Sequence, residues 1–421
     1  MNDMEFLRQI SRVDVLLGQS RYAQAEKLLE NLMPHGADNI EILKMMAIAK
    51  MGLHKYDDAD QICKVIMEQH PADAFSYYIM SNVNSAKRNF EDAKSLMDES
   101  IRLEPDNPDF HAFKANLFLR TKDYQEALES ADTALSADAE NIGALNARSG
   151  ALVGLGRNDE AFETIDKSLN TDPTNPDTHS NMGWGLLHRG QSDTALQHFK
   201  MALTEDPLHQ SAKAGMLEAM KAKFPLYRYF LMIMLWFGKL KGKNQWIIII
   251  GSYVGLRILS SLAEDNEKLW PYLMPVIIII AIFFLSTWIF SPLMNLYLLT
   301  NTFGRYTLSQ EQKWSAGFAG FSLFTSILFM ACFIFLWPNE GLLSSSIFVF
   351  LMMIPTGSMY NPDSERNKKK LILVTTLIGL LVLVNSTICI YSGVFSTSFS
   401  VLPLFGLIAY QWYANYIMIR E

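Results

Sequence analysis

The chain has 421 residues, a formal net charge of −7 and a composition in which half of the residues are hydrophobic. Residues 1–222 carry 35 acidic and 22 basic side chains, whereas residues 223–421 carry 8 and 14. An acidic first half without clustered Lys and Arg argues against nucleic-acid binding, because phosphate contacts require such clusters.

The first 207 residues contain a repeating unit of 34 residues. An alanine recurs at this spacing six times, as Ala25, Ala59, Ala93, Ala127, Ala161 and Ala195. An aromatic residue stands three places before the first four alanines, and Asn158 and Ser192 replace it in the last two. Prolines fall twelve residues after four of the alanines, where proline would end a helix. A fixed period of this length predicts a solenoid of helix pairs.

This pattern resembles the tetratricopeptide repeat family over residues 6–207, in six units. Gly156 and Gly190 match the family's inter-helix glycine in two of the units. Ala37 and Ala139 depart from the pattern, since they stand where proline is usual. The resemblance implies an all-α solenoid whose concave face is formed by the first helix of each unit. Leu208–Lys221 then has the length of the capping helix that such arrays need.

The resemblance also implies that a protein or peptide partner binds this concave face. The candidate groove residues are Tyr78, Asn82, Asn116, Arg120, Asn146 and Trp184. An asparagine amide can both donate to and accept from an extended backbone, and Trp184 would supply an aromatic anchor. At any single position, a merely tolerated surface residue is an equal alternative. Some members hold C-terminal carboxylates with a Lys-x-x-x-Asn pair, but here Ile48 follows Lys44, which argues against chaperone tails as ligands.

Residues 223–245 form a junction between the two halves. The apolar stretch Phe224–Leu240 is interrupted by Arg228 and is short for a membrane span. We interpret it as an amphipathic helix in the membrane interface, with the lysines at 239, 241 and 243 against anionic lipid. If this segment crossed the bilayer instead, the repeats would lie on the opposite side.

Residues 246–421 are expected to form a polytopic transmembrane helix bundle. Six apolar runs are long enough to cross a bilayer: Trp246–Leu262, Leu273–Leu298, Ser315–Trp337, Leu342–Met359, Leu371–Tyr391 and Val401–Met418. Lys and Arg concentrate in alternate loops, which predicts that both termini are cytoplasmic. The N-terminus lacks an apolar stretch typical of a signal peptide, in agreement with that orientation. We therefore expect a multi-pass membrane protein located in the bacterial inner membrane.

The residue inventory gives no catalytic constellation. All eight histidines lie in the repeat half, and the expected spans contain no Asp or Glu. Cys63, Cys332 and Cys389 form no CxxC pair, so we expect neither a metal site nor a cofactor, and no enzyme. Arg257 is the one charged side chain within an expected span. It either snorkels to the headgroups or takes part in gating or substrate binding.

The sequence thus predicts a repeat solenoid with its cap over residues 1–222, the interfacial junction and the membrane domain. The favoured function is a membrane-anchored scaffold for protein–protein interaction. Its partners would be a protein or peptide in the groove, the lipid bilayer, and a second membrane protein or another copy of the chain. The alternative is a small transporter or channel regulated through its repeats. The identity of the partner, the pathway and the oligomeric state do not follow from the sequence.

Overall fold

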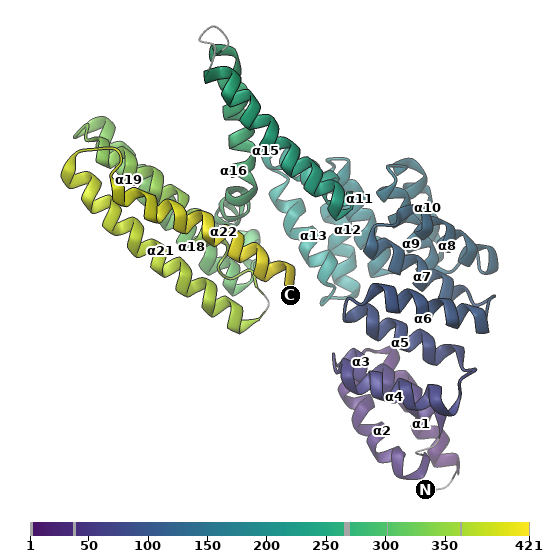
Figure 1. Cartoon of the computed structure of the whole chain (residues 1–421). Coiled ribbons are helices and arrows are strands. Elements are labelled where there is room, and N and C mark those ends of the chain that lie inside the picture. The colour runs from purple at the N-terminus through teal and green to yellow at the C-terminus, as the bar shows by residue number, and fades with distance from the viewer. Residues whose placement is uncertain (1–2, 37–38, 265–269, 301, 363, 421) are drawn as a thin grey trace. The chain divides into compact units, whose positions relative to one another are not determined.

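A computed structural model of the chain describes residues 3–36, 39–264, 270–300, 302–362 and 364–420. All regular secondary structure in these ranges is helical (Figure 1). The chain divides into two compact units. Unit 1 comprises Met1–Arg189, Gln197–Ala212 and Leu235–Lys241, and unit 2 comprises Gly190–Leu196, Lys213–Met234 and Gly242–Glu421. The domain boundaries expected after residues 222 and 245 stay predictions.

Six helix pairs reproduce the 34-residue register of the sequence. They are α1 (Asp3–Gly18) and α2 (Tyr22–Gly36), α3 (Ile40–Gly52) and α4 (Tyr56–Gln69), α5 (Ala74–Ala86) and α6 (Phe90–Leu103), α7 (Pro108–Thr121) and α8 (Tyr124–Ala137), α9 (Ile142–Gly154) and α10 (Asn158–Thr171), and α11 (Pro176–His188) and α12 (Ser192–Glu205). The second helix of every pair begins three residues before a repeated alanine, and all six alanines have no exposed surface. A methyl group is small enough to let two helices approach closely there.

Two further features recur at the same spacing. The first helices of repeats two to six start after a capping side chain that accepts a backbone N–H bond; these caps are Asn39, Asp73, Asn107, Asn141 and Asn175. Such a cap contributes about 1 kcal/mol to helix stability. The turn inside each repeat places one residue at positive φ, and these are Ser20, His54, Arg88, Lys122, Gly156 and Gly190. The two glycines of the family pattern therefore mark a left-handed position that four other residue types also occupy.

After the repeats follow α13 (Gln210–Lys221), at the place expected for the cap, and α14 (Pro225–Lys239). The end of α14 belongs to unit 1 and contacts the turn of the fourth repeat and the end of α9. Four bonds join them: Lys122 Nζ to Leu240 O at 2.8 Å, Tyr124 Oη to Lys239 O at 3.0 Å, Lys239 Nζ to Val153 O at 2.8 Å, and Lys241 Nζ to Asp123 Oδ1 at 2.6 Å.

These contacts give two of the junction lysines partners within the protein, and the lipid-binding role expected for the junction stays a prediction. Burial raises the pKa of Asp123, but bonds from Lys241, Thr121 and Lys94 outweigh it and lower the pKa to about 2. Asp123 is therefore ionised near neutral pH and pairs with Lys241, whose side chain is still 56% exposed. The sequence alone does not reveal these partners, because the carboxylate and the carbonyl lie more than 80 residues earlier in the chain.

Unit 2 contains the helices of the second half of the chain. They are α15 (Gly242–Glu264), α16 (Trp270–Thr300), α17 (Thr302–Thr307), α18 (Gln310–Phe335), α19 (Glu340–Leu351), α20 (Met353–Ser358), α21 (Glu365–Ser392), the 3-10 turn η1 (Ser398–Ser400) and α22 (Val401–Arg420). Each expected span overlaps one of these helices. The fourth span differs, because it is broken between α19 and α20. Pro355 lacks the N–H that would bond to Leu351, which explains a break at this point.

Within the described residues, three helical segments are long and apolar enough to cross a membrane: Gln310–Phe335, Glu340–Ser358 and Glu365–Ser392. That these segments, or α15, α16 and α22, cross a membrane stays a prediction. The helices of unit 2 pack through small polar residues. Ser326 Oγ donates to Ser346 O at 2.8 Å, and Ser346 Oγ donates to Ser326 O at 2.9 Å, so α18 and α19 exchange two bonds. Small residues of this kind let membrane helices pack closely.

Candidate functional site

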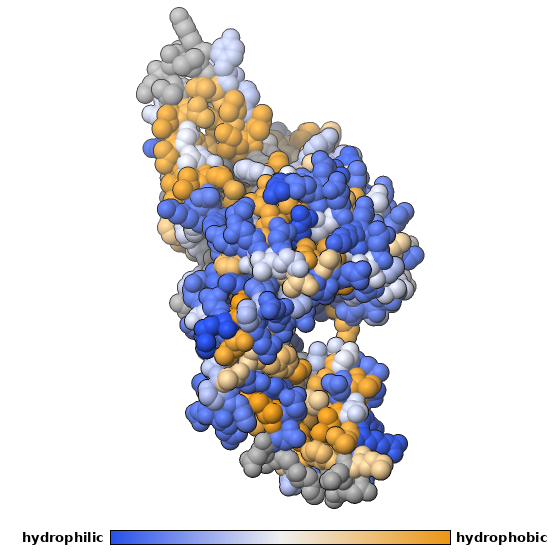
Figure 2. Space-filling view, turned by 90° about the vertical axis from the view of Figure 1, so that its right-hand side faces the viewer, coloured by the Kyte–Doolittle hydropathy of each residue, from blue (hydrophilic) through white to orange (hydrophobic). Residues whose placement is uncertain are grey.

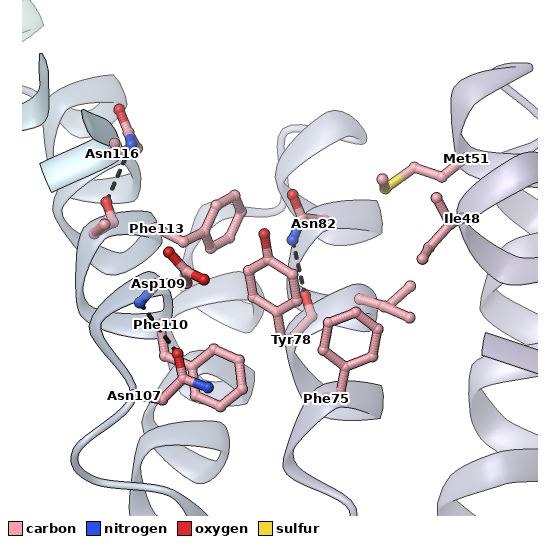
Figure 3. Close-up of a pocket in the computed structure, with 13 residues that line it drawn as sticks. Ile48, Met51, Phe75, Tyr78, Asn82, Asn107, Asp109, Phe110, Phe113 and Asn116 are labelled. Carbon is pink, nitrogen blue, oxygen red and sulfur yellow. Dashed lines mark hydrogen bonds between the residues drawn. The ribbon is translucent and has the colours of Figure 1, made fainter. Parts of the chain in front are cut away.

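The first helices of the second to fifth repeats line a cavity of about 470 Å³ (Figure 3). It is lined by Ile48, Met51, Phe75, Tyr78, Ile79, Asn82, Asn107, Asp109, Phe110, Ala112, Phe113, Asn116 and Gly143. We call it the groove. Three of the residues predicted from the sequence, Tyr78, Asn82 and Asn116, line it together. The structure thus brings these three side chains to one site.

Aromatic rings form one wall of the groove, with Tyr78 at their centre. The Tyr78 ring lies 5.5 Å from Phe75, stacks on Phe110 at 5.4 Å and meets Phe113 edge-on at 5.3 Å. Such pairs contribute about 0.5–1.5 kcal/mol each beyond the area that they bury. Burial raises the pKa of Tyr78, so its hydroxyl stays protonated and can donate. The groove therefore offers a rigid apolar surface with a hydroxyl at its edge.

Two asparagines add hydrogen-bonding capacity beside the rings. Asn82 Nδ2 donates to Tyr78 O at 3.0 Å, and Asn116 Nδ2 donates to Ala112 O at 3.0 Å. Each bond runs back one turn along the residue's own helix and fixes the direction of the amide. An asparagine amide has a second N–H and an oxygen with two lone pairs, so each can still bind a ligand.

A second cavity, of about 380 Å³, adjoins the groove and shares Phe113 and Asn116 with it. Arg120 lines this cavity, as the sequence predicted for a groove residue. Its Nη1 donates to Ser85 Oγ at 2.9 Å, and its guanidinium lies 5.3 Å from the Phe90 ring centre. These contacts hold the charge of Arg120 at the wall of the second cavity.

Asn146 and Trp184 line neither of these cavities. Asn146 Oδ1 accepts a bond from Asn181 Nδ2 at 3.2 Å. Trp184 Nε1 donates to Ser211 Oγ at 3.0 Å, and its ring meets Phe199 edge-on at 5.6 Å. The indole thus packs within its own region of the solenoid, and a groove role for these two residues stays a prediction.

Several residues that line the groove were not predicted from the sequence, among them three aromatic side chains and one carboxylate. Phe75, Phe110, Phe113 and Asp109 were not singled out, although Phe75 precedes Tyr78 by three residues and Phe110 precedes Phe113 by three. Aromatics three apart lie on one helix face, so an aromatic stripe on the first helices was the available signal. The family resemblance points only to the positions one helical turn away from these rings.

Arg257 lies on α15 in unit 2, and its side chain is exposed. An exposed position is consistent with a side chain that snorkels along the helix towards headgroups. Its role stays a prediction.

With the helix pairs and the groove described, the comparisons with known proteins assign the repeats. Tetratricopeptide repeat family models match residues 16–79, 85–142 and 164–197. Residues 16–197 are therefore a segment of the tetratricopeptide repeat family, as the sequence pattern indicated. No family is found for the C-terminal part of the chain. No curated protein matches the chain.

Several solved structures resemble the repeat array. YrrB, described as a tetratricopeptide repeat protein with an unusual peptide-binding site, is 18% identical, with 44% of this chain and 95% of YrrB covered and a TM-score of 0.32. MamA from Desulfovibrio magneticus RS-1 is 17% identical, with 41% and 98% covered and a TM-score of 0.34. PilW, a type IV pilus biogenesis factor, is 16% identical, with 45% and 88% covered and a TM-score of 0.39.

Proposed function

We propose that this chain is a membrane-anchored scaffold whose groove binds an extended segment of a partner protein. The observation that carries the proposal is the groove itself, in which a cluster of rings around Tyr78 lies beside the amides of Asn82 and Asn116. An apolar side chain of the partner would pack on the rings, and its backbone would bond to the amides. Tetratricopeptide repeats generally act in binding, so the proposed role is not catalytic.

The membrane anchor is supported by the exposed apolar side chains of unit 2. Phe321 on α18, Leu383 on α21 and Trp412 on α22 are 70%, 64% and 71% exposed. Figure 2 shows a similar hydrophobic surface over α15 and α16. Leaving such a side chain in water costs about 1.5–3 kcal/mol relative to an apolar surrounding. We infer that these helices face lipid and that six of them cross the bacterial inner membrane.

The junction helix α14 fits a position in the membrane interface. Leu226, Tyr229, Ile233 and Trp236 are all exposed, and their spacing of three, four and three residues puts them on one face. Tyr227 and Leu231 are buried on the opposite face. An exposed stripe that contains Tyr and Trp is typical of a helix lying at headgroup level.

The proposed orientation predicts that a reporter joined after Glu421 is cytoplasmic. A green fluorescent protein at this position should fluoresce, alkaline phosphatase there should be inactive, and both fusions should remain in the membrane after alkaline carbonate washing. Release by carbonate would contradict the anchor, and an active phosphatase would contradict the orientation.

Photo-crosslinking tests the groove in the full chain. Benzoylphenylalanine in place of Asn116, or of Arg120, should crosslink to one and the same protein in intact cells, through a single segment identified by mass spectrometry. The matched control is Lys64, whose side chain is 59% exposed on α4 and lies outside the groove. Adducts that form equally at Lys64, or different proteins at the two groove positions, would overturn the proposal.

A further inference from the structure

A third cavity, lined mainly by polar side chains, lies wholly within unit 2. It has a volume of about 380 Å³ and is lined by Ala214, Leu217, Glu218, Lys221, Ser291, Asn295, Ser309, Glu311, Gln312, Ser315, Gly357, Tyr360 and Asn361. The residues come from α13, α16, the start of α18 and the end of α20. A volume of this size is in the range of small-molecule sites, about 300–1,000 Å³. We call it the interface cavity because the start of α18, a helix long and apolar enough to cross a membrane, forms part of its wall.

Asn295 is the first sign that the interface cavity holds a ligand. Its side chain is only 6% exposed, and its Oδ1 has no hydrogen-bond partner. A buried polar group left unpaired costs about 1–3 kcal/mol, and such groups are rare in folded proteins. Because the two ends of an amide can exchange places, Asn295 could offer the ligand either an acceptor or a donor.

Lys221 is the second sign, because a lysine is seldom buried without a reason. It is 3% exposed, and its Nζ lies 2.9 Å from Glu218 Oε1. Tyr227 Oη donates to the other oxygen of Glu218 at 2.5 Å. Burial and the charge of Glu218 raise the pKa of Tyr227, so this donor stays protonated. The pair is thus fixed in place at the wall of the cavity.

The charge of the other carboxylate in the wall, that of Glu311, is also paired with a lysine. Glu311 Oε1 lies 2.5 Å from Lys368 Nζ, which contacts Glu365 at 3.0 Å as well. Because Lys221 is buried and already paired with Glu218, a purely anionic ligand would face the Glu218 carboxylate and a purely cationic ligand would face Lys221. A ligand that carries both signs can pair with Lys221 and with the carboxylates at once.

We propose that the interface cavity binds a small zwitterion that has an ammonium group and an anionic group. The anionic group would pair with Lys221, and the ammonium group with Glu311 or Glu218. Asn295, Gln312 and Asn361 would supply hydrogen bonds. This chemistry is found in the headgroup of phosphatidylethanolamine and in free solutes with the same groups. The inference does not depend on what the groove binds.

Binding to the purified full chain in detergent tests the proposal with three probes, by native mass spectrometry and by competition. Phosphatidylethanolamine or the soluble glycerophosphoethanolamine should bind at least about tenfold more tightly than the anionic phosphatidylglycerol. Binding of both ethanolamine probes would show recognition of the headgroup alone. Binding of phosphatidylethanolamine alone would show that the lipid is the source. Equal or tighter binding of phosphatidylglycerol, or no binding of either zwitterion, would overturn the proposal.

Two variants locate the bound zwitterion. Asn295→Leu should weaken its binding by about five- to tenfold, through the loss of one buried hydrogen bond. Asn361→Ala tests the same cavity at an exposed position where folding is not at risk, and it should weaken binding by about threefold. Ser386→Ala is the control, because Ser386 also has a buried polar atom without a partner but lies outside the cavity. An effect of Ser386→Ala equal to that of Asn295→Leu, or no effect of either cavity variant, would contradict the site.

Discussion

Replacing Asn82 and Asn116 together with alanine should weaken binding of the groove's partner by about 10- to 100-fold, since each amide would lose a hydrogen bond to the ligand. The solenoid should keep its stability. The amide N–H bonds of both residues run to carbonyls of their own helices, the Asn82 side chain also bonds to the Tyr78 side chain, and alanine has a higher helix propensity than asparagine. A peptide selected from a random library on the full chain in lipid nanodiscs provides the ligand, and fluorescence anisotropy gives the Kd.

Asn84 provides a matched control for this experiment. It lies on α5 with Asn82, and its Nδ2 donates to Met80 O at 2.9 Å in the same backward geometry, but it does not line the groove. Asn84→Ala should leave the Kd unchanged within about twofold. If Asn84→Ala weakened binding as much as Asn82→Ala, or if the double variant bound normally, the groove would not be the binding site.

The fold of the repeat half could be predicted because its signals are local and recur. The alanines, such as Ala93, must be small wherever two helices meet, so the sequence repeats as the structure does. The capping residues and left-handed turns recur at the same spacing, but residues as different as Arg88 and Gly156 satisfy the turn. The period of the left-handed turns is therefore visible only when backbone angles are known, whereas the Asn and Asp caps keep their 34-residue spacing in the sequence itself.

The sequence predicted only part of the candidate site, and the reason is physical. Tyr78 and Asn116 follow from the family position, but the environment of a side chain depends on its neighbours. Trp184 is bonded to Ser211, and that partner lies outside its repeat. The interface cavity could not be foreseen either, because Lys221 and Asn295 are 74 positions apart and carry no motif.

The close approach of α19 to α21 predicts a severe effect of substitution at Gly341. A Cβ atom there would lie 2.0 Å from Cys389 O and 2.6 Å from Ile390 N. These are backbone atoms, so the two helices would have to separate. Asn339 resists that separation, because its Oδ1 accepts from Gly341 N at 2.8 Å while its Nδ2 donates to Ile390 O at 2.9 Å. The position thus tolerates no side chain.

Gly341→Val should therefore destabilise unit 2 by about 3 kcal/mol or more, since overpacking against backbone exceeds the usual cost of an inserted methyl group. The expected result is loss of the monodisperse peak in fluorescence-detected gel filtration, or a Tm several degrees lower in detergent. Gly317→Ala is the control, because a Cβ at this helical position of α18 has no neighbour within 4 Å and alanine favours the helix. A Gly341→Val protein as stable as Gly317→Ala would mean that α19 and α21 do not pack at this distance.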